Sequence, residues 1–315
     1  MRREAKLSRW SVVAIGLMGL LTAMGGVCFA AGTPPADVLD AASCDALVRA
    51  AAANEAATAK DDTTKHMFRS RKQTPQGSQT RLYAETQQAM VGMTVANNDK
   101  PLTPEQKKEE ENRLMEMANN PDLLKHKHSQ EEENADRTLR ILKVLPEAFL
   151  FDYDGEEEGS AGLGRPGARL VRLKFRPNPG FQPPSRVEQV LVGMKGVVVI
   201  DPVDRRIAKI DGVLFKEVSF GWGILGHLDK GGHFLVQQCD AGHDSWEISR
   251  MSLEFTGKIL LFKSLSLKSD EVFDDFRSVP SDTTFAQGVQ ILKAEEGKLA
   301  PNRSTGTVES ESRPH

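Results

Sequence analysis

The sequence predicts an α+β domain built on a curved antiparallel β-sheet. Segments that alternate apolar and polar side chains, as half-buried strands do, recur along the chain and are joined by short turn sequences. Charged helical segments stand between some of these strands but do not follow each of them, so the order does not fit the alternation of a parallel sheet. The chain has 315 residues, enough for one large domain with additions.

The N-terminus has the pattern of a secretory signal peptide. Basic residues precede the apolar run SVVAIGLMGLLTAM, and small residues at Cys28 and Ala30 suit cleavage before Ala31. We therefore expect residues 1–30 to be removed. The mature chain should then lack a transmembrane span and lie in the periplasm or another extracytoplasmic space, free or peripheral to the envelope. Cys28 could instead carry a lipid, although Val27 is bulkier than such signals prefer.

Charge and cysteine content narrow the function classes. With 41 basic and 44 acidic side chains the formal net charge is −3, which gives no electrostatic reason to expect a nucleic-acid partner. Cys44 and Cys239 remain in the expected mature form. A disulfide between them and two separate thiols are both compatible with the sequence.

The N-terminal part of the domain is expected to contain one helix and three strands. Residues 36–59 are rich in alanine, with apolar side chains at helical spacing. The next block alternates on both sides of a turn at 75–78, which predicts a hairpin. A third strand should cover 90–95.

A charged helical insert is expected between about residues 100 and 142. Thr103 and Gln106 have the spacing of a capping box, with proline at the first helical position, which predicts a helix over 104–117. A second charged helix should cover 129–142. Runs of acidic residues in both are typical of solvated helix faces.

Strands are expected again in the middle of the chain. Residues 148–154 and 168–177 should be strands joined by a flexible polar loop, and the alternation over 171–175 predicts one buried face. A short helix should follow, because Ser185 and Glu188 have capping-box spacing before apolar residues at helical spacing.

The remainder should be an antiparallel meander of five strands with tight turns. The domain is expected to span residues 31–294, and the polar tail over 295–315 is expected to be disordered. Turns are expected at 201–204, 211–212, 240–244 and 256–258.

The segment FGWGILG, Phe220 to Gly226, has the glycine spacing of a dinucleotide-binding loop. Such a loop needs a helix directly after it, whose N-terminus faces the pyrophosphate. Here Gly231 and Gly232 interrupt any helix, and a strand pattern follows. We interpret the segment as a glycine-permitted bend between strands that places Trp222 against the interior, and we expect no cofactor.

No metal site is expected, because no Cys, Asp or Glu stands at a recognised ligand spacing from the histidines. They are interpreted as surface residues: His126, His128, His227, His233 and His243.

Catalytic residues are not expected either. Asp201, Asp204 and Asp211 lie at turn positions, where aspartate caps the local backbone. Motifs that present a hydrolytic serine or cysteine are absent from the sequence.

The run GVVVIDPVDRRIAKIDGVLFKEVSFGWG, with WEISRMSLEFTGKILLFKSLS after it, resembles exported bacterial envelope proteins, which are similar in turn to the LolA type of lipoprotein carrier. The resemblance covers about residues 36–294. It implies an open half-barrel of antiparallel strands, with helices over the concave face and a cavity for acyl chains or apolar peptide segments. The acidic insert departs from the carrier, so the carrier's exchange partners are not implied.

Three functions remain open from the sequence. The first is a non-catalytic carrier or sensor that binds a lipid or a lipoprotein acyl chain. The second is an envelope interaction or scaffold protein whose half-barrel is filled by its own helix, with another envelope protein as partner. An exported hydrolase is the third. A ligand is expected on the apolar face near the glycine bend, lined by Phe220, Trp222, Leu225, Phe234, Val236 and Trp246.

Overall fold

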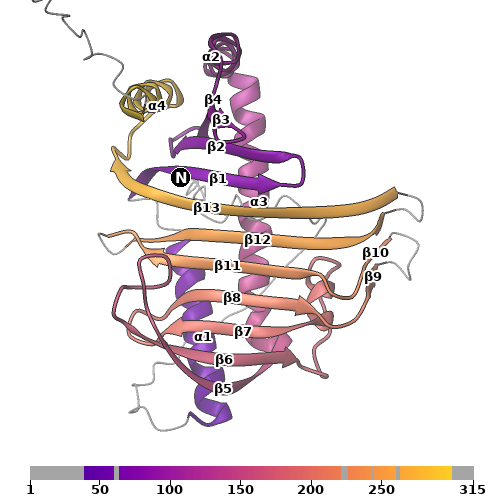
Figure 1. The fold of residues 1–315 in the computed structure, drawn as a ribbon. Helices are drawn as coiled ribbons and strands as arrows, with labels where there is room; N and C mark the ends of the chain where they lie inside the picture. The colour runs from indigo at the N-terminus through magenta and orange to yellow at the C-terminus, as the bar shows by residue number, and fades with distance from the viewer. Residues whose placement is uncertain (1–38, 60–63, 221–225, 243–244, 260–262, 300–315) are drawn as a thin grey trace, which may run out of the picture.

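A computed structural model describes residues 39–299, apart from 60–63, 221–225, 243–244 and 260–262. It is an α+β structure with one large open antiparallel sheet and a few helices (Figure 1), which confirms the predicted class. Within the described residues the sheet has 13 strands in the order β4-β3-β2-β1-β13-β12-β11-β8-β7-β6-β5, with β10 paired to β12 and β9 to β10.

The α-helices are α1 (Ala41–Thr58), α2 (Pro104–Asn119), α3 (Pro121–Ala148) and α4 (Phe285–Leu299), and η2 (Glu188–Gly193) is a 3-10 helix. The strands of the first half are β1 (Lys65–Thr74), β2 (Gly77–Ala84), β3 (Val91–Asn97), β4 (Lys100–Pro101), β5 (Phe149–Glu158) and β6 (Arg169–Pro177). Those of the second half are β7 (Met194–Asp201), β8 (Arg206–Leu214), β9 (Val218–Phe220), β10 (Gly226–Leu228), β11 (His233–Asp240), β12 (Trp246–Ile259) and β13 (Lys263–Val279).

Local capping starts the two charged helices. The predicted capping box is present, because the side chain of Thr103 accepts from Gln106 and the side chain of Gln106 accepts from Thr103. Helix α3 is longer than predicted: it begins at Pro121, where Asn120 caps two backbone N–H groups, and it contains Pro146 near its end. The predicted helix start at Ser129 was wrong, because Asn120 caps the helix and proline occupies its first position, a start signal that was not recognised among the polar residues before Ser129.

The main core lies between α1 and one face of the sheet, which we call the helix face. A row of paired apolar residues crosses this face from β6 to β12. Helix α1 contributes Cys44, Val48 and Ala51 to the same buried cluster. In Figure 1 both α1 and α3 lie behind the sheet on this side. The paired row is Leu173, Val198, Ile210, Val236 and Met251.

A buried ion pair fixes α1 to the sheet. Glu55 of α1 and Arg206 of β8 have side chains only 1% and 6% exposed, and Arg206 donates to both carboxylate oxygens at 2.9 and 3.1 Å. The backbone N–H of Ile207 donates to the same carboxylate at 2.9 Å, and the Arg206 guanidinium lies 5.5 Å from the centre of the Trp246 ring. Both charges are therefore compensated by protein groups.

The opposite face is covered only in part. Leu82 alternates along β2 with Tyr83, which packs on the helix-face cluster, so the cluster that joins Leu82 to Phe285 and Leu292 of α4 lies on the other side. On β12 and β13 the opposite face carries cross-strand ion pairs, such as Arg250 with Asp270 at 3.0 Å. This part of the face is a solvated, charged surface.

Two predicted turns are continuous strand. Strand β8 runs through Gly212, where a Cβ would lie 2.9 Å from the Met194 side chain, and β12 runs through Gly257, where it would lie 2.1 Å from the His227 carbonyl oxygen. Both glycines serve close packing within the sheet and not chain reversal.

Two further predictions need correction. The segment after Ser185 forms a six-residue 3-10 helix, not an α-helix, and the predicted capping box is not formed, because the Ser185 hydroxyl contacts the Glu188 carboxylate instead. Helix α4 continues to Leu299, beyond the point near Ala294 where the polar tail was expected to begin.

Candidate functional site

The structure brings together only some of the residues predicted to bind a ligand. Val236 is buried in the helix-face cluster, and Phe220 and Phe234 pack against it half-buried. Trp246 instead packs in a separate cluster around Val199, beside the β5–β6 connection. Trp222 and Leu225 lie outside the described residues.

The glycine segment joins two paired strands. Phe220 at the end of β9 is paired antiparallel with Gly226 at the start of β10. Because a strand and not a helix follows Gly226, the arrangement lacks the helix N-terminus that a dinucleotide site requires. The predicted connection between strands is confirmed, although the bend itself lies outside the described residues.

The aspartates take structural positions. Asp201 is buried, and its Oδ1 accepts from the backbone N–H groups of Val203 and Asp204, as expected of a turn cap. Asp211 lies within β8, where it pairs with His233 of β11 at 2.9 Å. These carboxylates do not converge on one another through any contact among the described residues.

Both cysteines of the domain are free and buried. Burial raises the pKa of the Cys44 thiol, and it raises the pKa of the Cys239 thiol to about 11. Because the thiolate is the reactive form, neither group is a nucleophile at neutral pH.

The helix face also holds a strip of half-buried apolar side chains, which we call the apolar strip. It lies on β11, β12 and β13, whereas the close packing of α1 is against β5, β7 and β8, and that of α3 is against α1, α2, β5 and η2. Fully buried Met251 begins the alternation that places Leu253 and Phe255 on this face. The strip consists of Phe234, Leu253, Phe255 and Leu265.

An aromatic pocket lies at β1 and β13. Phe68 stacks on Tyr83 with ring centres 5.2 Å apart, and it contacts Phe273 at 6.1 Å and Phe276 at 5.6 Å. The pocket has a volume of about 20 Å³, room for a single water molecule. Its lining is Phe68, Glu85, Met90, Glu247, Ile248, Phe273 and Phe276.

A buried polar cluster forms one end of this pocket. His66 is 1% exposed, and its Nδ1 lies 3.2 Å from the Glu247 carboxylate and 4.0 Å from that of Glu85. The Ser245 hydroxyl donates to Glu247 at 3.0 Å, and the backbone N–H of His66 donates to Glu85 at 2.9 Å. The pocket therefore combines an aromatic wall with an acidic end.

Helix α3 reaches this region through Glu131. Its carboxylate accepts from the backbone N–H of Met90, a pocket residue, at 3.2 Å, and it pairs with Lys127 at 2.7 Å. Burial raises the pKa of Glu131, and the nearby Lys127 only partly opposes this effect. The folded protein therefore disfavours the charged form of Glu131 relative to the unfolded chain.

We expect Glu131→Gln to make the chain as stable as the wild type or more stable at pH 7. A carboxyl group with a raised pKa stabilises the fold most below its unfolded value of about 4.3 and loses that contribution as pH rises through the folded pKa. The advantage of the variant should therefore disappear near pH 4, which thermal unfolding at both pH values measures. Glu133→Gln, on the exposed side of α3, is the control. A clear loss of stability of Glu131→Gln at pH 7 would show that the Lys127 pair outweighs burial.

Comparison with known proteins does not assign a family. No protein-family model matches the chain, and neither does any curated protein or solved structure. The resemblance to the LolA type of carrier therefore stays a prediction. Among the described helices, none combines the length and apolar character needed to cross a membrane.

The pocket residues were missed by the sequence predictions. Phe68 and Phe273 are more than two hundred positions apart, and they meet because β1 pairs with β13. Alternation in each strand indicates which side chains are buried, but it does not indicate which strands become neighbours.

Proposed function

We propose that the protein is a non-catalytic carrier or sensor that binds an acyl chain, from a lipid or a lipoprotein, on the helix face of its sheet. The observation that carries this proposal is the half-buried apolar strip, which lies beyond the strands on which α1 packs. Half-buried apolar side chains gain free energy when a ligand removes the rest of their surface from water.

The aromatic pocket supplies a second support. Aromatic side chains provide large apolar contact areas with little loss of conformational freedom, and they dominate ligand contacts in proteins. As it stands the pocket has a volume of only about 20 Å³, whereas ligand pockets measure about 300–1,000 Å³. Ligand entry therefore requires movement of half-buried lining side chains such as Met90 and Phe276.

A half-barrel shape of the sheet is part of the same proposal. A half-barrel would make the helix face concave, with α1 over β5, β7 and β8 and the apolar strip beside it, and would enclose an acyl chain on several sides. An extracytoplasmic location, with residues 1–30 removed, would bring the protein to the lipids and lipoproteins of the envelope.

The packing of α1 favours one alternative, an interaction or scaffold protein of the envelope. Helix α1 fills part of the helix face with Cys44, Val48 and Ala51, and the Glu55–Arg206 pair fixes it there. If the apolar strip serves only as core, the chain has no ligand and acts through its surface.

Titration with a fluorescent fatty-acyl probe distinguishes the two functions. If the protein binds acyl chains, the probe signal should saturate. Leu253→Gln should then weaken the affinity for the probe about tenfold, because a loss of about 1.4 kcal/mol of apolar contact corresponds to that factor. Ser252→Gln introduces the same side chain on the opposite face and should leave binding unchanged. A scaffold predicts no saturable signal, and an equal effect of both substitutions would place the probe elsewhere.

A further inference from the structure

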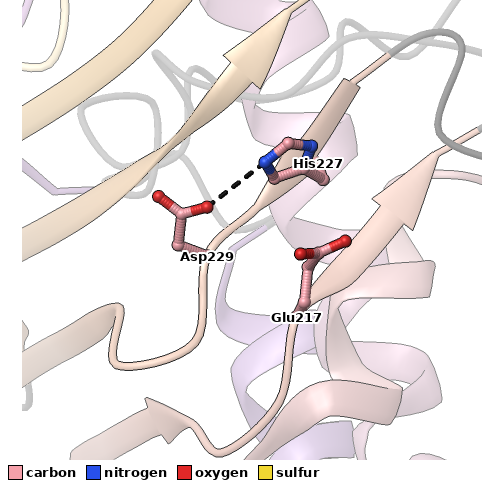
Figure 2. A group of neighbouring side chains, drawn as sticks. All are labelled: Glu217, His227 and Asp229. Carbon is pink, nitrogen blue, oxygen red and sulfur yellow. Dashed lines mark ion pairs between the residues drawn. The ribbon is translucent and has the colours of Figure 1, made fainter.

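The β9–β10 hairpin gathers three metal-binding side chains on one face. His227 of β10 is paired with Ser219 of β9, and Leu228 with Val218, so Glu217 and Asp229 follow directly across from each other. Residues opposite each other in an antiparallel pair, and residues two apart on one strand, point to the same side. Figure 2 shows that the side chains of Glu217, His227 and Asp229 approach one another from the two arms of the hairpin.

The geometry points to a site for a divalent transition-metal ion, with Glu217, His227 and Asp229 as its protein ligands. One ligand atom of each residue lies within 4.8 Å of those of the other two, and His227 Nε2 lies 3.3 Å from Asp229 Oδ1. A tetrahedral ion with bonds of about 2.0–2.2 Å holds its ligand atoms roughly 3.4 Å apart. Small side-chain rotations are therefore enough to close the site.

Hydroxyl groups orient both carboxylates. The Thr256 hydroxyl of β12 donates to Asp229 Oδ2 at 2.7 Å, which leaves Oδ1 towards His227. The Ser219 hydroxyl donates to Glu217 Oε1 at 3.0 Å. Partners of this kind hold metal ligands in place and raise metal affinity.

The surrounding charges and exposure suit a cation. Two carboxylates and one neutral imidazole give the ligand set a charge of about −2, which a divalent ion neutralises. Among the nearby lysines, Lys216 lies over the Phe215 ring at 5.6 Å. The exposed Lys258, paired with His227 across β10 and β12, and the exposed Lys230, next to Asp229 along the chain, are the competing cations. Glu217 is exposed and the other two ligands are half-buried, so water can complete the coordination.

The ligand types select the class of ion. Imidazole with two carboxylates suits Zn²⁺ and its transition-metal neighbours, whereas Ca²⁺ and Mg²⁺ prefer oxygen ligands alone. A bound ion would connect β9 to β10 and, through Thr256, to β12. This metal site is independent of acyl binding, because none of its ligands belongs to the apolar strip or the aromatic pocket.

Calorimetric titration of the untagged, chelator-treated chain with Zn²⁺ tests the site. We expect one ion per chain, with binding weakened at least about tenfold in His227→Ala and in Glu217→Gln. His233→Ala is the matched control, because His233 also pairs with an aspartate, Asp211, but no third ligand lies close to this pair among the described residues. Circular dichroism verifies that each variant is folded.

Three results would overturn the metal site. One is the absence of Zn²⁺ binding to the wild-type chain. The second is equal binding by the wild type, His227→Ala and Glu217→Gln. The third is a loss in His233→Ala equal to that in His227→Ala, which describes adventitious binding to surface histidines.

Discussion

Glu55→Ala is expected to lower the free energy of unfolding by about 3–5 kcal/mol, the largest loss that we predict for a single polar side chain in this protein. Removal of the carboxylate leaves the guanidinium of Arg206 buried without its counter-charge and leaves the N–H of Ile207 without its acceptor. In a domain of this size such a loss lowers the melting temperature by roughly 10 °C. Urea titration followed by circular dichroism measures the change.

Two comparisons separate burial of charge from loss of contact. Arg250→Ala breaks a pair with Asp270 whose side chains are 47% and 39% exposed, and it should cost less than about 1 kcal/mol. The double change Glu55→Leu with Arg206→Met removes both charges and should restore much of the stability. If Glu55→Ala costs no more than Arg250→Ala, the pair does not fix α1 to the sheet.

Phe68→Ala is expected to cost about 3–5 kcal/mol as well, because it leaves a cavity among three aromatic rings. Phe68 is 7% exposed and contacts Tyr83, Phe273 and Phe276, so its ring connects β1, β2 and β13. The void should also enlarge the aromatic pocket and admit small apolar molecules. Denaturant unfolding measures the loss of stability, and binding of benzene or a similar probe measures the new space.

Val272→Ala is the matched control for this change. Val272 lies next to Phe273 on β13, but it is 41% exposed, and its loss should change stability by less than about 0.5 kcal/mol. Similar values for Val272→Ala and Phe68→Ala would mean that the aromatic cluster does not act as core.

Local signals in the sequence predicted much of the fold. The predicted start of α2 was correct, because the signal is local: Thr103, Pro104 and Gln106 form the helix start without help from the rest of the fold. The prediction of strand β6 was correct, because alternating apolar and polar side chains are enough to indicate a strand with one buried face. The continuation of β8 through Gly212 was missed because the reason for that glycine, the side chain of Met194, lies on another strand.

The candidate sites depend on pairings that the sequence does not reveal. Trp246 was predicted to line one apolar face with Phe234 and Val236, but it packs with Val199 in a separate cluster. Glu217 and Asp229 were not recognised as a ligand pair because they become neighbours only when β9 pairs with β10. A motif with fixed spacing along the sequence cannot predict contacts that arise only when two strands pair.

Displacement of a bound fluorescent fatty-acyl probe by phospholipid, measured on the wild-type chain, tests the proposed function most directly. Acyl binding at the apolar strip predicts one saturable probe site per chain and complete displacement as phospholipid is added. Absence of saturable probe binding, or a signal that phospholipid leaves unchanged, would contradict the proposal and favour the scaffold function.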